Sequence, residues 1–262
     1  MNLSQVSRTA ILTLVTRVVA SERQNAQFND PMAVRCLEGL VSAASPEERD
    51  WILSRRRFYA GVSVHDAIAG ARRARAFDGI ATQYVAANPG CTIVNLGCGF
   101  DTRFWRIANE HCRYVEIDLP EVVELKAEIL KDDLAYELVG CSVLDASWID
   151  RVTARGHDRF LLLAEGLLMF LPEPDVGHLF RRLAERFSDS QFAFDMVPRK
   201  YLKGLWKTLL HLEATINWRL SVSWVSGFND AREIESYAPG IRVVDKKAGS
   251  AGPIIVAAIN AA

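Results

Sequence analysis

The sequence predicts an α/β protein in which an N-terminal helical extension precedes a doubly wound, mostly parallel, seven-stranded sheet. Two observations lead to this prediction. From Cys91 onward, short apolar segments alternate with segments of helical length, which is the pattern of repeated βαβ units. The first apolar segment ends in a turn that contains Gly97 and Gly99, where ligand-binding parallel sheets carry a glycine-rich loop.

The extension covers residues 1–88 and is predicted to be helical. Pro31 follows an aspartate and Pro46 precedes two glutamates, so both prolines stand where the first turn of a helix tolerates them. A longer helical pattern begins at Val64 and stops before Asn88-Pro89-Gly90. These helices either add to the core or cover a binding site as a lid.

Residues 89–262 are predicted to form the ligand-binding α/β domain, in one compact unit with the helices. An insertion at about 198–228, which contains aromatic residues and lysines, is expected to contact the substrate and to wall a pocket for it or to pack in the core. The expected strands are 91–96, 113–117, 137–142, 159–164, 190–196, 241–246 and 254–259. The expected helices of this domain are 103–109, 120–132, 147–155, 174–187, 199–215 and 230–236.

Composition excludes several classes of protein. Half of the 262 residues are hydrophobic, which is enough for a substantial core. The 31 basic and 32 acidic residues leave a formal charge of -1, so nucleic acid and membrane surfaces are not expected partners. The five cysteines are scattered without a CxxC pair, which predicts reduced thiols in the cytoplasm and no metal site.

The glycine turn favours a nucleoside cofactor that lacks phosphate. Asp118 ends the second apolar segment, 21 positions after Gly97, where an acid commonly binds the ribose hydroxyls. Thr102 stands where a dinucleotide-binding turn has its third glycine, and Asp101 would repel a pyrophosphate but attract a cation. S-adenosylmethionine has a ribose, an ammonium and a sulfonium, so the turn favours it over NAD and makes Asp101 a candidate contact.

Acids also follow the later strands, and all are expected at the same edge of the sheet. Asp145 either contacts the adenine amino group or caps the next helix. Glu165 follows five apolar residues, and an unpaired carboxylate is costly to bury there. We therefore expect Glu165 to meet a cationic ligand rather than a structural salt bridge, and the same reasoning extends to Asp195.

Several motifs together resemble the leucine carboxyl methyltransferase family, and its bacterial branch of tetracenomycin-type polyketide O-methyltransferases in particular. The resemblance lies in residues 28–31, 73–78, 94–103, 116–120, 165–172 and 230–234, in this order. It implies a class I S-adenosylmethionine-dependent methyltransferase fold. It assigns the methionine part to Gly97 and Gly99, the ribose to Asp118, the adenine to Leu144 and Asp145, and the methionine ammonium to Glu165.

The resemblance also assigns the methionine carboxylate to Arg75, with Arg73 as its helper. A guanidinium can hold a carboxylate through two hydrogen bonds. From the residues alone, a solvated helix face is the preferred explanation for both arginines.

The expected function is transfer of a methyl group to a carboxylate or hydroxyl of a small molecule of secondary metabolism, with S-adenosylhomocysteine as the product. A carboxylate is ionised at neutral pH and needs no base, whereas a phenol with a pKa near 10 benefits from one. His211, in the insertion, is the candidate base, although a surface or packing role would also explain it.

Two alternatives stay open: a methyltransferase for protein C-terminal carboxylates, and a catalytically silent interaction protein that keeps the fold. The intact glycines and Asp118 speak against the silent protein. The absence of a large insertion for a protein partner speaks against the first. The oligomeric state is not predicted.

Overall fold

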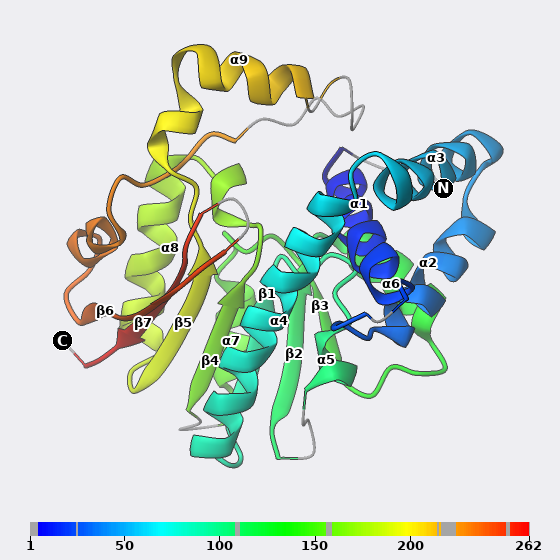
Figure 1. The fold of residues 1–262 in the computed structure, drawn as a ribbon. Helices are drawn as coiled ribbons and strands as arrows, with labels where there is room; N and C mark the ends of the chain where they lie inside the picture. Colours follow the sequence, from blue (N-terminus) through cyan, green and yellow to red (C-terminus); the bar gives the residue numbers. More distant parts are fainter. Residues whose placement is uncertain are drawn as a thin grey trace.

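The computed structural model describes residues 5–24, 26–107, 111–155, 159–213, 215, 224–249 and 252–261, with the backbone alone for residues 5–7, 210, 211 and 213. Its centre is a seven-stranded sheet in the order β3-β2-β1-β4-β5-β7-β6 (Figure 1). The strands are β1 (Thr92–Leu96), β2 (Arg113–Asp118), β3 (Glu137–Gly140), β4 (Phe160–Ala164), β5 (Ser190–Asp195), β6 (Ile241–Lys247) and β7 (Ile254–Ile259).

The sheet is parallel except for one strand. Strands β1 to β5 pair in parallel, whereas β7 runs antiparallel to both β5 and β6. The order of the strands reverses between β1 and β4, which lie side by side at the centre. The predicted mostly parallel, doubly wound sheet of seven strands is therefore confirmed, and each expected strand overlaps an observed one.

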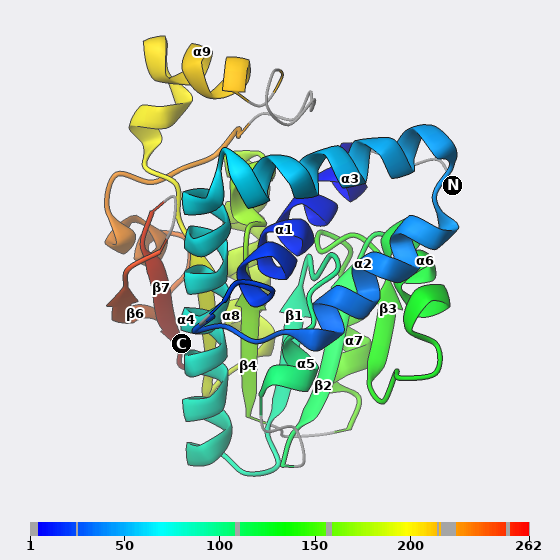
Figure 2. The same ribbon diagram turned by 45° about the vertical axis from the view of Figure 1, so that its right-hand side comes forward.

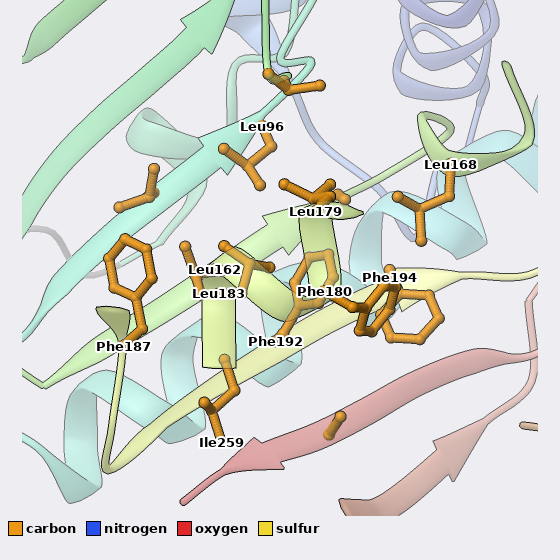
Figure 3. Close-up of a cluster of buried hydrophobic side chains, with 14 of the residues drawn as sticks. Leu96, Leu162, Leu168, Leu179, Phe180, Leu183, Phe187, Phe192, Phe194 and Ile259 are labelled. Carbon is orange, nitrogen blue, oxygen red and sulfur yellow. The ribbon is translucent and has the colours of Figure 1, made fainter. Parts of the chain in front are cut away.

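Helices cover both faces of the sheet. On one face lies α4 (Val64–Ala87), whose Phe77, Ile80 and Tyr84 pack on Ile93 and Leu161. On the other face lie α7 (Ser147–Thr153) and α8 (Glu173–Arg186), which bury the aromatic core shown in Figure 3. Because neighbouring residues of a buried strand point to opposite faces, β4 places Leu161 and Leu163 under α4, and Leu162 under α8.

The N-terminal helices form a second apolar cluster beside the sheet (Figure 2). They are α1 (Gln5–Ser21), α2 (Pro31–Ala43) and α3 (Pro46–Gly61), with α6 (Pro120–Leu130) against α2. Both predicted proline starts are confirmed, because Asp30 caps α2 and Ser45 forms a capping box with Glu48 at α3. The fourth helix of the predicted extension, α4, is a layer of the sheet domain itself.

The insertion after β5 contains the 3₁₀ turn η2 (Arg199–Leu202) and α9 (Gly204–Glu213). Helix α9 lies apart from the sheet (Figures 1 and 2), whereas Phe228 pairs with Pro198 where the insertion begins. In the described part of α9, four large apolar side chains are roughly half exposed or more: Leu205, Trp206, Leu209 and Leu212. The remaining helical pieces are α5 (Arg103–Arg106), η1 (Leu168–Phe170) and η4 (Ala231–Ser236).

Candidate active site

The predicted site residues gather at the carboxyl ends of β1, β2, β4 and β5, on both sides of the point where the strand order reverses. Parallel sheets bind ligands at this place. Gly97 follows β1, Asp118 ends β2, Glu165 follows β4 and Asp195 ends β5. These residues are far apart in the sequence, and the topology alone brings them to one edge.

The glycine turn has a backbone that other residues rarely adopt. Gly97 and Gly99 have φ values of +62° and +50°, in the left-handed region that favours glycine. A Cβ atom at Gly97 would lie 2.8 Å from Leu167 Cδ1, and one at Gly99 would lie 2.8 Å from the Cβ of Ala10 in α1. The turn therefore needs both glycines for its shape and for its close contact with α1 and Leu167.

Asp118 is tied to the same turn. Its Oδ2 accepts a hydrogen bond of 2.6 Å from the Gly99 N–H, and its Oδ1 accepts one of 2.7 Å from the Leu119 N–H. Burial raises the pKa of Asp118, although the two amides partly offset this effect. The carboxylate thus stands at the end of β2 beside Gly99, in the position expected for a ribose ligand.

Asp101 has a different role from the one expected. Its carboxylate accepts hydrogen bonds from Arg103 Nη1 at 2.5 Å, Asn95 Nδ2 at 3.0 Å and Arg106 Nη2 at 3.1 Å. Burial would raise its pKa, but the two arginines outweigh burial and hold the pKa far below the ordinary value. Because these arginines neutralise Asp101, its charge neither repels a pyrophosphate nor attracts a cation as the sequence argument assumed.

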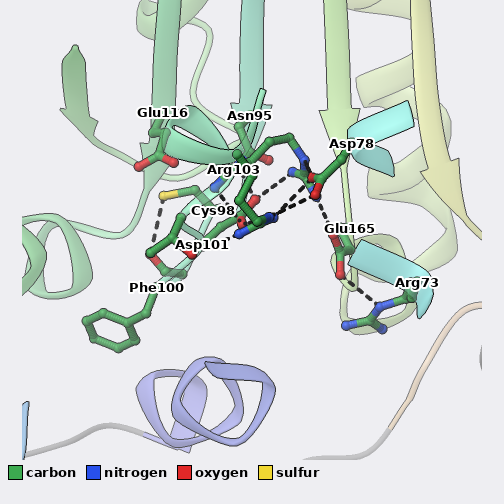
Figure 4. A network of polar contacts seen from close by, with 12 residues as sticks. Arg73, Asp78, Asn95, Cys98, Phe100, Asp101, Arg103, Glu116 and Glu165 are labelled. Carbon is green, nitrogen blue, oxygen red and sulfur yellow. Dashed lines mark hydrogen bonds and ion pairs between the residues drawn. The ribbon is translucent and has the colours of Figure 1, made fainter. Parts of the chain in front are cut away.

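Arg103 is the centre of a buried ion network (Figure 4). Its side chain is fully buried and pairs with Asp78 of α4 at 2.9 Å, with Asp101 at 2.5 Å and with Glu165 at 2.6 Å. One guanidinium therefore links α4, the glycine turn and the end of β4. The five donors of its planar fork explain why an arginine occupies this position.

Arg106 extends the network to the N-terminal helices. It pairs with Asp78 at 2.8 Å, with Asp101 at 3.1 Å and with Asp30, the N-cap of α2, at 2.7 Å. Arg17 of α1 donates a hydrogen bond of 2.7 Å to the Phe100 carbonyl and lies 3.6 Å from Asp30. Helices α1 and α2 are thereby fixed to the glycine turn.

The structure separates the two arginines that were expected to act together. Arg73 donates to Glu165 at 2.9 Å and to Asp195 at 3.4 Å, whereas Arg75 is exposed on α4 and has no ion pair among the described residues. Two residues along a helix correspond to a rotation of about 200°, so the side chains leave α4 on opposite sides. Arg73, and not Arg75, is the arginine that faces the sheet edge.

Glu165 forms structural salt bridges, which the sequence favoured less than a contact with a cationic ligand. Its two oxygens pair with Arg73 and Arg103, and Figure 4 shows it between them. Burial by itself raises the pKa of Glu165, but the two arginines lower it below the ordinary value. Beside it, Gly166 has a φ of +69°, and its N–H donates to Asp195 Oδ1 at 2.7 Å.

The expected adenine contacts follow β3, and the candidate base belongs to α9. Leu144 is half-buried, whereas Asp145 is exposed and accepts a hydrogen bond of 2.9 Å from the Ser147 N–H at the start of α7. The amide and the Ser147 hydroxyl lower the pKa of Asp145. Asp145 thus binds the first amide of α7, although Ala146 holds the N-cap position that was its alternative explanation. The side chain of His211 lies outside the described residues.

A separate buried pair supports the glycine turn from beneath. Lys126 of α6 is fully buried and donates hydrogen bonds of 2.6 Å to Glu116 and to the Asp101 carbonyl. Glu116, two residues before Asp118 on β2, is therefore part of a structural ion pair. The sequence indicated neither this pair nor the roles of Arg103 and Arg106.

The connected network carries a surplus of negative charge. Within the described part of the chain it joins four arginines to five carboxylates, namely Arg17, Arg73, Arg103 and Arg106 with Asp30, Asp78, Asp101, Glu165 and Asp195. The side chains of these groups are at most 15% exposed, and an extra charge interacts more strongly there than at the surface. The edge therefore favours a ligand with a net positive charge.

Comparison with known proteins identifies the family. The profile of the leucine carboxyl methyltransferases matches residues 10–184, which hold the glycine turn and almost all of the ion network. The chain belongs to this family. The resemblance proposed from the sequence motifs is thereby confirmed.

Relatives within this methyltransferase family include bacterial proteins. The chain is 30% identical to the tetracenomycin polyketide synthesis O-methyltransferase TcmP of Streptomyces glaucescens, over 65% of this chain and 60% of TcmP. It is 32% identical to a putative S-adenosyl-L-methionine-dependent methyltransferase of Streptomyces coelicolor, over 70% of this chain and 66% of that protein. The chain thus spans about three fifths to two thirds of the length of these curated relatives.

Solved structures establish the class I methyltransferase fold. A protein described as a possible exported protein of Bordetella parapertussis superposes with a TM-score of 0.59 at 14% identity, over 99% of this chain and 98% of that chain. Magnesium protoporphyrin IX methyltransferase of Synechocystis PCC 6803, solved with bound S-adenosylhomocysteine, superposes with a TM-score of 0.51 at 16% identity, over 87% of this chain and 99% of that chain.

Proposed function

We propose that the protein is an S-adenosylmethionine-dependent O-methyltransferase that acts on a carboxylate or hydroxyl of a small molecule of secondary metabolism. One observation supports this proposal most strongly. The chain belongs to the leucine carboxyl methyltransferases, and three of the motif segments on which the resemblance rests, around Asp30, Asp78 and Asp101, meet in one network at the sheet edge. The N-terminal helices and the glycine turn thereby frame one site.

The side chains at this edge suit S-adenosylmethionine. The glycine turn brings backbone to the end of β1, Asp118 offers a carboxylate for ribose hydroxyls, and Leu144 offers an apolar surface for adenine. The surplus negative charge of the network suits a cationic ligand and opposes a dinucleotide. When bound, this cofactor supplies a methyl group that a positively charged sulfur makes electrophilic.

Arg73 and Glu165 would hold the amino-acid end of this cofactor. In the described structure the two side chains pair with each other, so a ligand that brings both an ammonium and a carboxylate can replace either partner without leaving a charge unpaired. The Nη2 atom of Arg73 has no acceptor among the described contacts and is available to a carboxylate. Arg103 would keep Glu165 in place during this exchange.

The acceptor is proposed to be a carboxylate or an acidic hydroxyl. The histidines whose side chains are described, His65, His111 and His178, are all exposed, so this part of the chain offers no histidine as a base at the sheet edge. A carboxylate needs none, because it is ionised at neutral pH. The named activity of TcmP supports a small polyketide-like acceptor.

Calorimetric titration with S-adenosylmethionine, S-adenosylhomocysteine and NAD tests the cofactor. We expect micromolar binding of both adenosyl ligands, no binding of NAD, and a loss of at least about a hundredfold in adenosyl affinity for Asp118→Ala, because a buried polar partner of the ribose is removed. His211→Ala should keep the wild-type affinity. Normal binding by Asp118→Ala would place the site elsewhere.

A panel of acceptors tests the reaction. Purified protein with S-adenosylmethionine is incubated with aromatic carboxylic acids, phenols, and a peptide that ends in leucine, and methylated products are identified by mass spectrometry. Methyl esters or ethers of the small molecules are the expected products. Methylation of the peptide alone would favour the protein-carboxylate activity, and cofactor binding without any product would favour a silent protein.

A further inference from the structure

The five carboxylates of the ion network are not equally compensated. Asp101 has two arginines within 3.1 Å, and Glu165 has two within 2.9 Å. Asp195 has one arginine within ion-pair distance among the described residues, Arg73, and at 3.4 Å this is a longer contact than any that Asp101 or Glu165 makes. The surplus negative charge of the network is therefore concentrated at Asp195.

The environment of Asp195 agrees with this inequality. The residue is 4% exposed, and apart from Arg73 its carboxylate accepts a hydrogen bond from the Gly166 N–H. Burial raises the pKa of Asp195, whereas arginines lower the pKa values of Glu165 and Asp101. A buried carboxylate with so little compensation is costly, so a cation that approaches it is bound with a corresponding gain.

The charge of the proposed ligand changes during its reaction. The methionine end brings one ammonium and one carboxylate, which cancel, and the sulfonium adds one positive charge. When the methyl group leaves, the bonding electron pair stays on sulfur, and the product is a neutral thioether. The sulfur is only a few bonds from the amino-acid end of the ligand. When Arg73 and Glu165 hold that end, the sulfur lies at the same sheet edge as Asp195, which ends β5.

We propose that Asp195 is a positioning and charge-balancing residue that makes the site bind S-adenosylmethionine in preference to S-adenosylhomocysteine. This inference rests on the proposed function. Asp195 compensates the sulfonium and anchors Arg73 from the side opposite Glu165. Once the methyl group has been transferred, the balance is lost, so the product is released more readily than it would be from a neutral site.

Asp195→Asn tests the inference by calorimetry on the full chain. The asparagine Oδ1 can still accept the Gly166 hydrogen bond, so the variant removes the charge and little of the shape. We expect the ratio of the two dissociation constants to shift against S-adenosylmethionine by on the order of tenfold, as one unit charge at short range predicts. The affinity for S-adenosylhomocysteine should stay nearly constant. Equal weakening of both ligands would show a purely structural role and overturn the inference, as would an unchanged ratio.

Glu173→Gln is the matched control. Glu173 begins α8, downstream of β4, and pairs with Arg199 at 3.0 Å, so the change removes one exposed negative charge. This control should leave the ratio unchanged. A thermal melt of each variant establishes that it is folded before the titrations are compared.

A second measurement needs no substitution. Sinefungin has a protonated amine in place of the methylsulfonium group and therefore keeps the positive charge. Wild-type protein should bind sinefungin as tightly as S-adenosylmethionine and more tightly than S-adenosylhomocysteine. If sinefungin binds like the neutral product, the charge argument is wrong. If the wild-type protein binds none of the three ligands, the proposed function itself fails, which is a different result.

Discussion

Arg103→Met should destabilise the protein more than any other single change in the ion network. The guanidinium is fully buried and pairs with Asp78, Asp101 and Glu165, and it also lies 5.5 Å from the ring centre of Phe77. Methionine fills a similar volume without charge. The variant therefore leaves three buried carboxylates with one cation fewer and raises the surplus negative charge of the network.

The size of the loss in stability follows from the ion pairs that the variant keeps. Asp78 and Asp101 keep Arg106, and Glu165 keeps Arg73, so no carboxylate loses every partner. The loss should thus resemble that of one broken buried pair, about 3–5 kcal/mol, rather than a multiple of it. For a domain of this size, this corresponds to a fall in Tm of about 6–20 °C.

The effect should also depend on pH. In the wild type, the folded-state pKa values of Asp101 and Glu165 are lowered, so their stabilising contribution is complete above the unfolded pKa of about 4 and is lost as pH falls through the folded values. In the variant, the loss of a cation raises those pKa values. The carboxylates then take up protons at a higher pH than they do in the wild type, and the difference in stability between the two proteins shrinks as the pH falls.

Urea denaturation followed by circular dichroism, at several pH values between 5 and 8, measures both effects. Arg186→Met is the control, because Arg186 and Asp150 are 44% and 70% exposed and such a pair contributes about 0–1 kcal/mol. A loss in Arg103→Met as small as in this control, or one that does not change with pH, would refute the reasoning.

Three further predictions concern single residues near the turn. Gly99→Ala should lower the free energy of unfolding by about 1–3 kcal/mol, because φ is +50° and a Cβ atom has no room there. Gly79→Ala, inside α4 where a Cβ atom would meet nothing within 4 Å, should instead raise it by about 0.5–1 kcal/mol. Equal Tm values for the two variants would contradict this prediction. Lys126→Met should lower stability by about 3–5 kcal/mol, since its buried carboxylate partner loses its cation, and an unchanged urea midpoint would show that the pair is dispensable. Arg73→Ala should weaken binding of S-adenosylmethionine by at least about tenfold in calorimetry, and Arg75→Ala by less than about twofold; the reverse order would restore the role that the sequence motif assigns to Arg75.

The sequence predicted the sheet well because its signal is local. Each buried strand is a short apolar run with turn residues on both sides, so β4 could be located from Phe160 to Ala164 without knowledge of its neighbours. The end of a strand also fixes where the next residue lies, so Asp118 and Glu165 were placed at the correct edge.

The side-chain partners could not be predicted, because they depend on contacts across the fold. Asp101 was interpreted from its position beside the glycine turn, but its partners come from α5, a single helical turn whose orientation the sequence does not reveal. The choice between Arg73 and Arg75 depends on which side of α4 faces the sheet. A pattern was nevertheless present: Asp30, Asp78 and Arg103 all stand in the motifs that carry the family resemblance, and charged residues in such motifs must have partners when buried.

The two ends of the insertion after β5 are bonded to each other where they join the sheet domain. The Phe228 N–H donates to the Val197 carbonyl at 2.9 Å, and the Arg199 N–H donates to the Phe228 carbonyl at 3.1 Å. The two ends are thus already closed, and the entropy of loop closure changes only slowly with the length of chain between them. The segment can therefore be exchanged as a unit: chimaeras that graft the corresponding segment of a relative between Pro198 and Phe228 should fold on the same sheet, which offers a way to vary the proposed acceptor region without changing the sheet edge.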